Sequence, residues 1–70
     1  MNSNEKHIFV VDFLTSGKNP GILLAQKKME EALLIKEYIR MGPPDSLAIT
    51  DPVLFARLRS AITQLMLDGW

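Results

Sequence analysis

The chain has 70 residues, with eight basic and eight acidic side chains, one histidine and no cysteine. This length allows one small domain at most, and the missing cysteines exclude disulfides and thiolate zinc sites. Zero net charge argues against a protein that holds nucleic acid by bulk positive charge. We expect no metal and no cofactor, and a single domain over residues 1–70 that is stabilised by packing or by self-association.

The polar residues 1–6 predict a short flexible tail. Residues 7–14 follow and are rich in β-branched and aromatic side chains. In a strand, one face of this segment would be wholly apolar and the other nearly so, which is typical of a strand covered on both sides. We predict a β-strand over residues 7–14. The alternative is a helix with Ser3 or Asn4 as its N-cap and Gly17 just past its end.

A long helix is predicted next, from about residue 20 to residue 41. Asn19 followed by Pro20 forms a good helix start, because an N-cap side chain precedes a residue whose fixed φ suits the first helical position. Residues 25–33 are nearly all strong helix formers. The Gly-Pro-Pro sequence that begins at Gly42 then ends the helix.

The predicted long helix carries two apolar stripes, whereas a surface helix needs only one. We therefore expect other parts of the protein to bury it from two directions. One stripe holds Ile22, Ala25, Met29, Ala32, Leu33 and Ile39, and the other holds Leu23, Leu24, Leu34, Ile35, Tyr38 and Met41.

The last part of the chain predicts a short helical turn and a second helix. Asp45 and Ser46 would open the turn, and Asp51 before Pro52 is a further helix start. The apolar residues that follow lie in one arc, as in an ordinary amphipathic helix. We predict this helix over about residues 51–67.

A single strand leaves backbone N–H and C=O groups unpaired along both edges. No second strand is evident, so we expect residues 7–14 to pair antiparallel with the same strand of a second copy about a two-fold axis. The predicted fold class is therefore mainly α, with a strand before two helices in an intertwined homodimer. The alternative is a three-helix monomer.

No arrangement of side chains in the sequence predicts catalysis. Glu30 and Glu31 are adjacent and would point about 100° apart on a helix. His7 and Asp12 would lie on opposite faces of the predicted strand. We expect a protein that is not an enzyme. An enzymatic role would need a site shared across a dimer interface, and we assign no residues to one.

We expect instead a non-enzymatic interaction or regulatory module that binds another protein through an apolar helical surface. Trp70 has two interpretations, as a lid that packs over the core or as part of a partner site. The candidate interaction residues are Ile8, Val10, Leu34, Ile35, Tyr38 and Trp70.

An alternative function follows from the order strand, helix, helix, which resembles that of ribbon-helix-helix repressors. The resemblance implies a small dimeric DNA-binding regulator. In that family the outward face of the strand carries polar or basic side chains, whereas here both faces are apolar apart from Asp12. The order of elements is the only resemblance, and we do not expect a nucleic-acid partner.

The sequence also bears on location. The N-terminal residues show no secretory signal, and the apolar runs are far shorter than the roughly 20 residues of a membrane-spanning helix. We expect a cytoplasmic protein without membrane contact.

Overall fold

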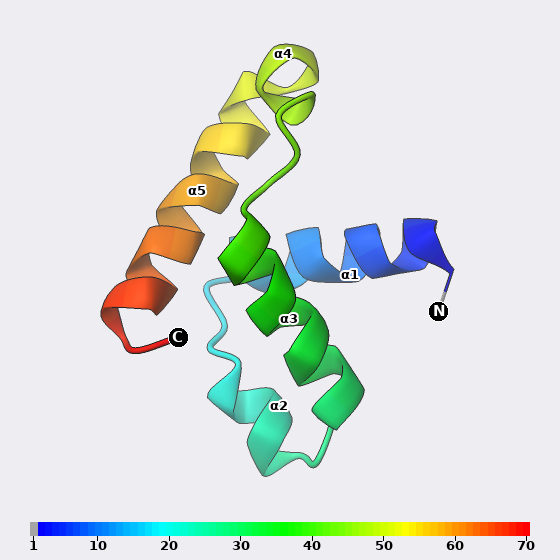
Figure 1. Cartoon of the computed structure of the whole chain (residues 1–70), viewed down its shortest axis with the longest axis vertical. Coiled ribbons are helices and arrows are strands. Elements are labelled where there is room, and N and C mark those ends of the chain that lie inside the picture. The colour runs from blue at the N-terminus through cyan, green and yellow to red at the C-terminus, as the bar shows by residue number, and fades with distance from the viewer. Residues whose placement is uncertain (1) are drawn as a thin grey trace.

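The computed structural model describes residues 2–70, and over this range it contains five α-helices and no strand (Figure 1). The predicted mainly-α class is confirmed. The helices are α1 Ser3–Thr15, α2 Gly21–Ala25, α3 Met29–Met41, α4 Leu47–Thr50 and α5 Pro52–Leu67.

The predicted strand over residues 7–14 is wrong, because this segment is the larger part of α1. The helix begins with a capping box: the Asn2 side chain accepts a hydrogen bond from the Glu5 N–H at 2.8 Å, and the Glu5 carboxylate accepts one from the Asn2 N–H at 3.4 Å. A helix pairs its own backbone groups, so the strand pairing that was predicted to join two copies is lost with the strand.

The apolar residues of α1 explain why the helix forms. Val10, Phe13 and Leu14 are buried at a spacing of three and four residues, which is the spacing of one helix face. Gly17 follows with φ +73°, a conformation that favours glycine, as the alternative helical interpretation expected. The predicted flexible tail over residues 1–6 is also wrong, because α1 already begins at Ser3. Residue 1 lies outside the described part of the chain.

The predicted long helix over residues 20–41 is divided into α2 and α3. The chain turns at Lys27, which has φ +59°, and the Lys28 N–H donates to the Leu23 carbonyl at 2.8 Å. The turn lets α2 fold back beside the first half of α3 (Figure 1), so that Leu23 and Ala32 both reach the core. Helix propensity favours a straight helix here, but the packing of α2 on α3 overrides it.

Three helix boundaries follow local signals that the sequence already contains. The Asn19 side chain accepts a hydrogen bond from the Gly21 N–H at 2.8 Å, next to the predicted start. The Asp51 side chain caps α5 by accepting from the Leu54 N–H at 3.1 Å. Gly42 ends α3 with φ +79°. Helix α2 begins one residue later than predicted, at Gly21 with Pro20 as its N-cap. The other two boundaries, the short turn that forms α4 and the end of the last helix at residue 67 agree with the predictions.

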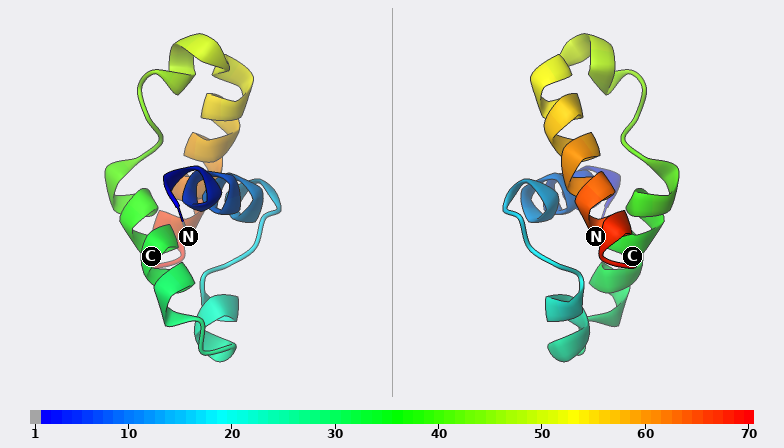
Figure 2. Two further views of the ribbon diagram at one scale, coloured as in Figure 1. Left: turned by 90° about the vertical axis from the view of Figure 1, so that its right-hand side faces the viewer. Right: turned by 90° about the vertical axis from the view of Figure 1, so that its left-hand side faces the viewer.

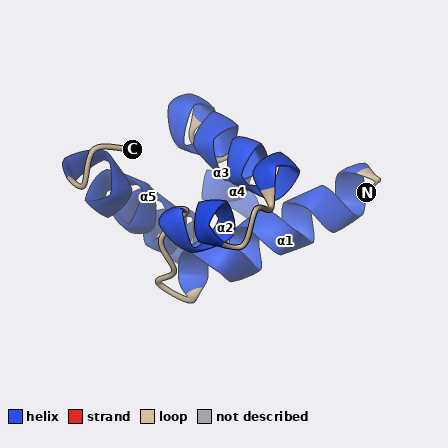
Figure 3. Cartoon of the chain, turned by 90° about the horizontal axis from the view of Figure 1, so that it is seen from below, coloured by secondary structure: helices blue, strands red, loops and turns tan. Residues whose placement is uncertain are grey.

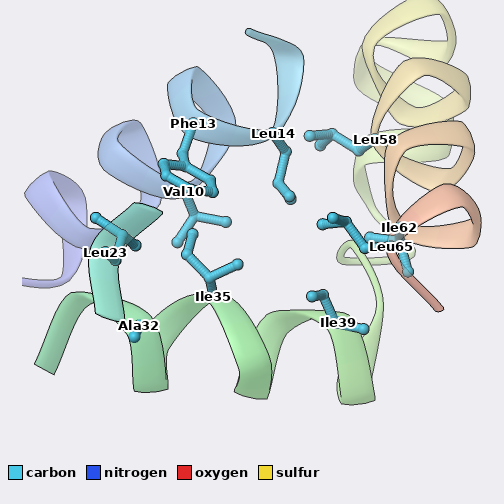
Figure 4. Packing of buried hydrophobic residues seen from close by; sticks show 10 residues of the cluster. All are labelled: Val10, Phe13, Leu14, Leu23, Ala32, Ile35, Ile39, Leu58, Ile62 and Leu65. Atoms are coloured by element: carbon cyan, nitrogen blue, oxygen red, sulfur yellow. The ribbon is translucent and has the colours of Figure 1, made fainter. Parts of the chain in front are cut away.

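One apolar core joins four of the five helices, with α1 packed against both α3 and α5 (Figure 4). Ile35 and Leu58 are its most enclosed side chains, each with 0 % exposure. The buried set is Val10, Phe13, Leu14, Leu23, Ala32, Ile35, Ile39, Leu58, Ile62 and Leu65.

The enclosure of Ile35 gives a direct test of this core. We expect Ile35→Val to lower the free energy of unfolding by about 0.5–1.5 kcal/mol, because it removes one methyl group from a closely packed site. The matched control is Ile49→Val, which deletes the same group where the side chain is 86 % exposed, and we expect it to change stability by less than about 0.5 kcal/mol. Urea unfolding followed by circular dichroism measures both, and equal effects would contradict the packing described.

The turn at Lys27 gives a test in which the direction of the stability change distinguishes the divided helix from one continuous helix over residues 20–41. Since the residue has a positive φ, Lys27→Gly should leave stability unchanged or raise it by up to about 1 kcal/mol. If residues 20–41 formed one helix, the same change would cost about 1 kcal/mol. Ala56→Gly, at an exposed position within α5, is the control and should cost about 1 kcal/mol in thermal or urea unfolding.

Candidate functional site

An open groove of about 530 Å³ lies between the first half of α1, the second half of α3 and the connection that follows α3. It forms because the N-terminal turns of α1 extend beyond α3 (Figure 1), so that the two helices diverge there. Its size falls within the range of ordinary ligand pockets. The apolar part of the lining is Val10, Leu34, Tyr38, Met41, Pro43 and Pro44.

The walls of the groove carry charges of both signs. Lys6 and His7 lie on the α1 side. Glu37 on α3 and Asp45 on the connection lie on the other side. The groove therefore combines an apolar floor with one basic and one acidic edge.

The Tyr38 hydroxyl is the one buried side-chain polar atom in residues 2–70 that lacks a hydrogen-bond partner. The residue is only half-buried as a whole, but its oxygen is enclosed at the groove lining. Burial raises the pKa of the Tyr38 phenol above the ordinary value of 10.0. An unpaired buried hydroxyl is costly, so this oxygen lowers the stability of the free protein.

The groove brings together three of the six predicted interaction residues, Val10, Leu34 and Tyr38. Ile35 does not reach it, because its side chain is fully enclosed in the core. Ile8 is 59 % exposed but not among the groove residues. It lies two positions before Val10, so it points about 200° away around α1.

Trp70 is half-buried and lies against other parts of the chain. A Cβ atom at Gly21 would be 3.7 Å from the indole ring, and the Lys36 ammonium lies 6.0 Å from the ring centroid. The Trp70 N–H donates to the Leu65 carbonyl at 2.9 Å. This is the lid arrangement, and Trp70 does not line the groove.

Sequence reasoning missed Lys6, Glu37 and Met41 as members of the site. Two of them had a usable signal. Met41 belongs to the same predicted stripe as Leu34 and Tyr38, and Lys6 lies one helical turn before Val10 once residues 7–14 are placed in a helix. Glu37 had no signal, because only the position of α1 makes it a groove residue.

Residues 2–70 contain no group of three side chains placed to hold a metal ion. Within the same range, no helix combines the length and apolar character needed to cross a membrane.

The chain was compared with protein-family models, curated proteins and solved structures, and none of the three comparisons found a match.

Tyr38→Phe tests the unpaired hydroxyl. We expect this variant to be at least as stable as the wild type at neutral pH, because it removes a buried polar atom that has no partner and keeps the ring. Below pH 10.0 both the folded and the unfolded wild type hold the phenol proton. Above that pH the unfolded state loses its proton first, so the wild type should lose stability relative to Tyr38→Phe.

Urea unfolding at neutral and alkaline pH measures this difference. Tyr38 is the single tyrosine of the chain, so an absorbance titration of the phenolate reports on it alone. A phenol that titrates at or below its ordinary pKa would contradict its burial in the groove.

Proposed function

We propose that this chain is a non-enzymatic module that binds another protein, and that the groove between α1 and α3 is its docking site. The observation that carries the proposal is the open groove itself, whose apolar floor is edged by Lys6 on one side and by Glu37 and Asp45 on the other. No group of three side chains that could hold a metal ion accompanies it in residues 2–70.

The occupant that suits this groove is an amphipathic helix. Both helical walls use their backbone groups internally, and residues 2–70 offer no sheet edge, so an extended peptide would find few backbone partners there. A helix satisfies its own backbone and needs only side-chain contacts. Its apolar residues would recur every three or four positions and rest on Leu34 and Met41.

The charges at the groove add one requirement for each flank of this partner. An acidic side chain on one flank of the helix would face Lys6, and a basic one on the other flank would face Glu37 and Asp45.

DNA binding is the alternative, and one observation favours it. The exposed face of α5 carries Arg57 and Arg59, and no acidic residue occurs from Pro52 to Leu67. However, the Arg59 guanidinium lies 5.8 Å from the Phe55 ring centroid, and the chain as a whole is neutral. The strand that supported the resemblance to ribbon-helix-helix repressors is a helix. We therefore propose a protein partner.

The docking site can be tested by placing a photo-crosslinking amino acid at Met41, which is 73 % exposed at the groove, and separately at Met66, which is 59 % exposed on α5 outside it. In native cells we expect the Met41 position to form an adduct with one other protein, and the Met66 position to form none. The crosslinked peptide should map by mass spectrometry to an amphipathic helix of the kind described.

The same helix, made as a peptide, then provides a quantitative test. Leu34→Glu should weaken its binding by at least about tenfold, because the change puts a charge on the apolar floor. Met66→Glu is the control and should leave the affinity unchanged. Adducts that form equally from both positions would contradict the groove as a docking site. So would a peptide that binds Leu34→Glu as tightly as it binds the wild type.

A further inference from the structure

A second hollow adjoins the groove and follows the first half of α3. Its volume is about 490 Å³, and it shares the residues Lys6 and Leu34 with the groove. Glu30, Glu31 and Leu33 complete its lining. The left view of Figure 2 shows this side of the molecule, where α3 runs its whole length past the N-terminal end of α1. The groove and the second hollow therefore form one trough that follows α3 over most of its length.

The trough is open to solvent along α3. Met41 toward one end is 73 % exposed, and Leu33 toward the other end is 61 % exposed. The N-terminal end of α1, which forms the opposite wall, projects beyond the other helices (Figure 3). A partner can therefore lie along α3 without displacing any part of the described chain.

The side of α3 that lines the trough repeats after seven residues. Glu30 and Glu37 are acidic and seven residues apart, and Leu34 and Met41 are apolar and seven residues apart. Seven residues complete nearly two helical turns, so each pair lies on one side of α3, separated by about 10.5 Å along the axis. A repeat of seven is the spacing at which two helices that lie side by side keep the same faces in contact. The repeat therefore favours a partner helix that lies along α3 over one that crosses it.

We propose that the partner helix lies alongside α3 over the whole trough and carries two basic residues seven positions apart. The proposal rests on the docking of a helix in the groove and adds the length and the charge spacing of that helix. One basic side chain faces Glu37, and the other faces Glu30. An acidic side chain on the opposite flank faces Lys6, which lines both hollows. Because residues 30–41 of α3 line the trough, the partner helix has about three turns.

The acidic residues along the trough are available to bind basic side chains. Glu37 is paired with Arg40 at 3.8 Å, but both side chains are well exposed, so this ion pair is weak. Glu30 has no ion pair among the described residues. Glu31 lies beside it in the lining, and Asp45 lies near Glu37 at the other end. Both ends of the trough therefore favour basic side chains over acidic ones.

A photo-crosslinking amino acid at Leu33 tests the extension of the docking site, beside the Met41 position that tests the docking site itself. In native cells we expect both positions to form adducts with the same helix of the same protein. Since Leu33 and Met41 are eight residues apart along α3, the two crosslinked residues of the partner should lie about eight positions apart. The Met66 position on α5 is again the control and should form no adduct.

The two crosslinking positions separate the two proposals. An adduct from Met41 without one from Leu33, or adducts with two different proteins, would overturn the extended trough and leave the groove as a docking site. The absence of both adducts would overturn the two proposals together. A crosslinked helix that lacks basic residues seven positions apart would overturn the charge spacing alone.

A peptide with the sequence of the crosslinked helix then measures the contact at Glu30. Glu30→Lys should weaken its binding about fivefold, because an attractive charge pair becomes a repulsive one. Exchanging the basic peptide residue that faces Glu30 for glutamate should restore the binding to Glu30→Lys. Asp12→Lys makes the same charge change at an exposed position of α1 outside the trough. It is the matched control and should leave the affinity unchanged.

Circular dichroism verifies that each variant keeps its helices. A peptide that binds Glu30→Lys as tightly as the wild type, but loses affinity for Leu34→Glu, would contradict the contact at Glu30 and leave the groove intact. An equal effect of Asp12→Lys, or a peptide exchange that restores nothing, would also contradict this contact. A peptide that tolerates Leu34→Glu would contradict the docking of a helix in the groove itself.

Discussion

The packing of α1 across α3 at Ile35 is the contact on which the rest of the molecule depends. Ile35 has no exposed surface, and Val10 and Phe13 of α1 lie over it (Figure 4). Because α1 is fixed at this crossing, its first turns extend past α3, and Lys6 lines the same groove as Tyr38. The groove is thus a consequence of where two helices cross, and the connection after α3 completes its lining. A change at the crossing would alter the core and the groove together.

The turn at Lys27 is the second constraint, because it sets the length of α3 and what covers it. A continuous helix over residues 20–41 would need partners on two sides for its two apolar stripes. The turn instead moves Leu23 back onto the core and leaves Met29 and Leu33 on the outside. The surplus of exposed apolar side chains on α3 therefore follows from the fold itself.

The helix boundaries could be predicted from the sequence where the signal is local. Asn19, Gly42 and Asp51 act through their own neighbouring backbone groups, so residue type and position are sufficient to locate them. Residues 7–14 are apolar on nearly every side, so the spacing of their apolar residues did not distinguish a helix from a strand. The prediction of a strand was wrong. The positive φ of Lys27 had no signal at all, because lysine rarely adopts it and only tertiary packing makes it favourable.

The candidate site, too, could be predicted from the sequence only in part. Leu34 and Tyr38 could be named in advance because they share one stripe of α3, whereas the groove they line exists only through the crossing of α1. With this crossing in place, the three faces of α3 have different physical roles. The inner face is uniformly apolar and fits the core, and the side face combines apolar residues with one unpaired hydroxyl. The outer face carries charged and apolar side chains that the described chain leaves exposed.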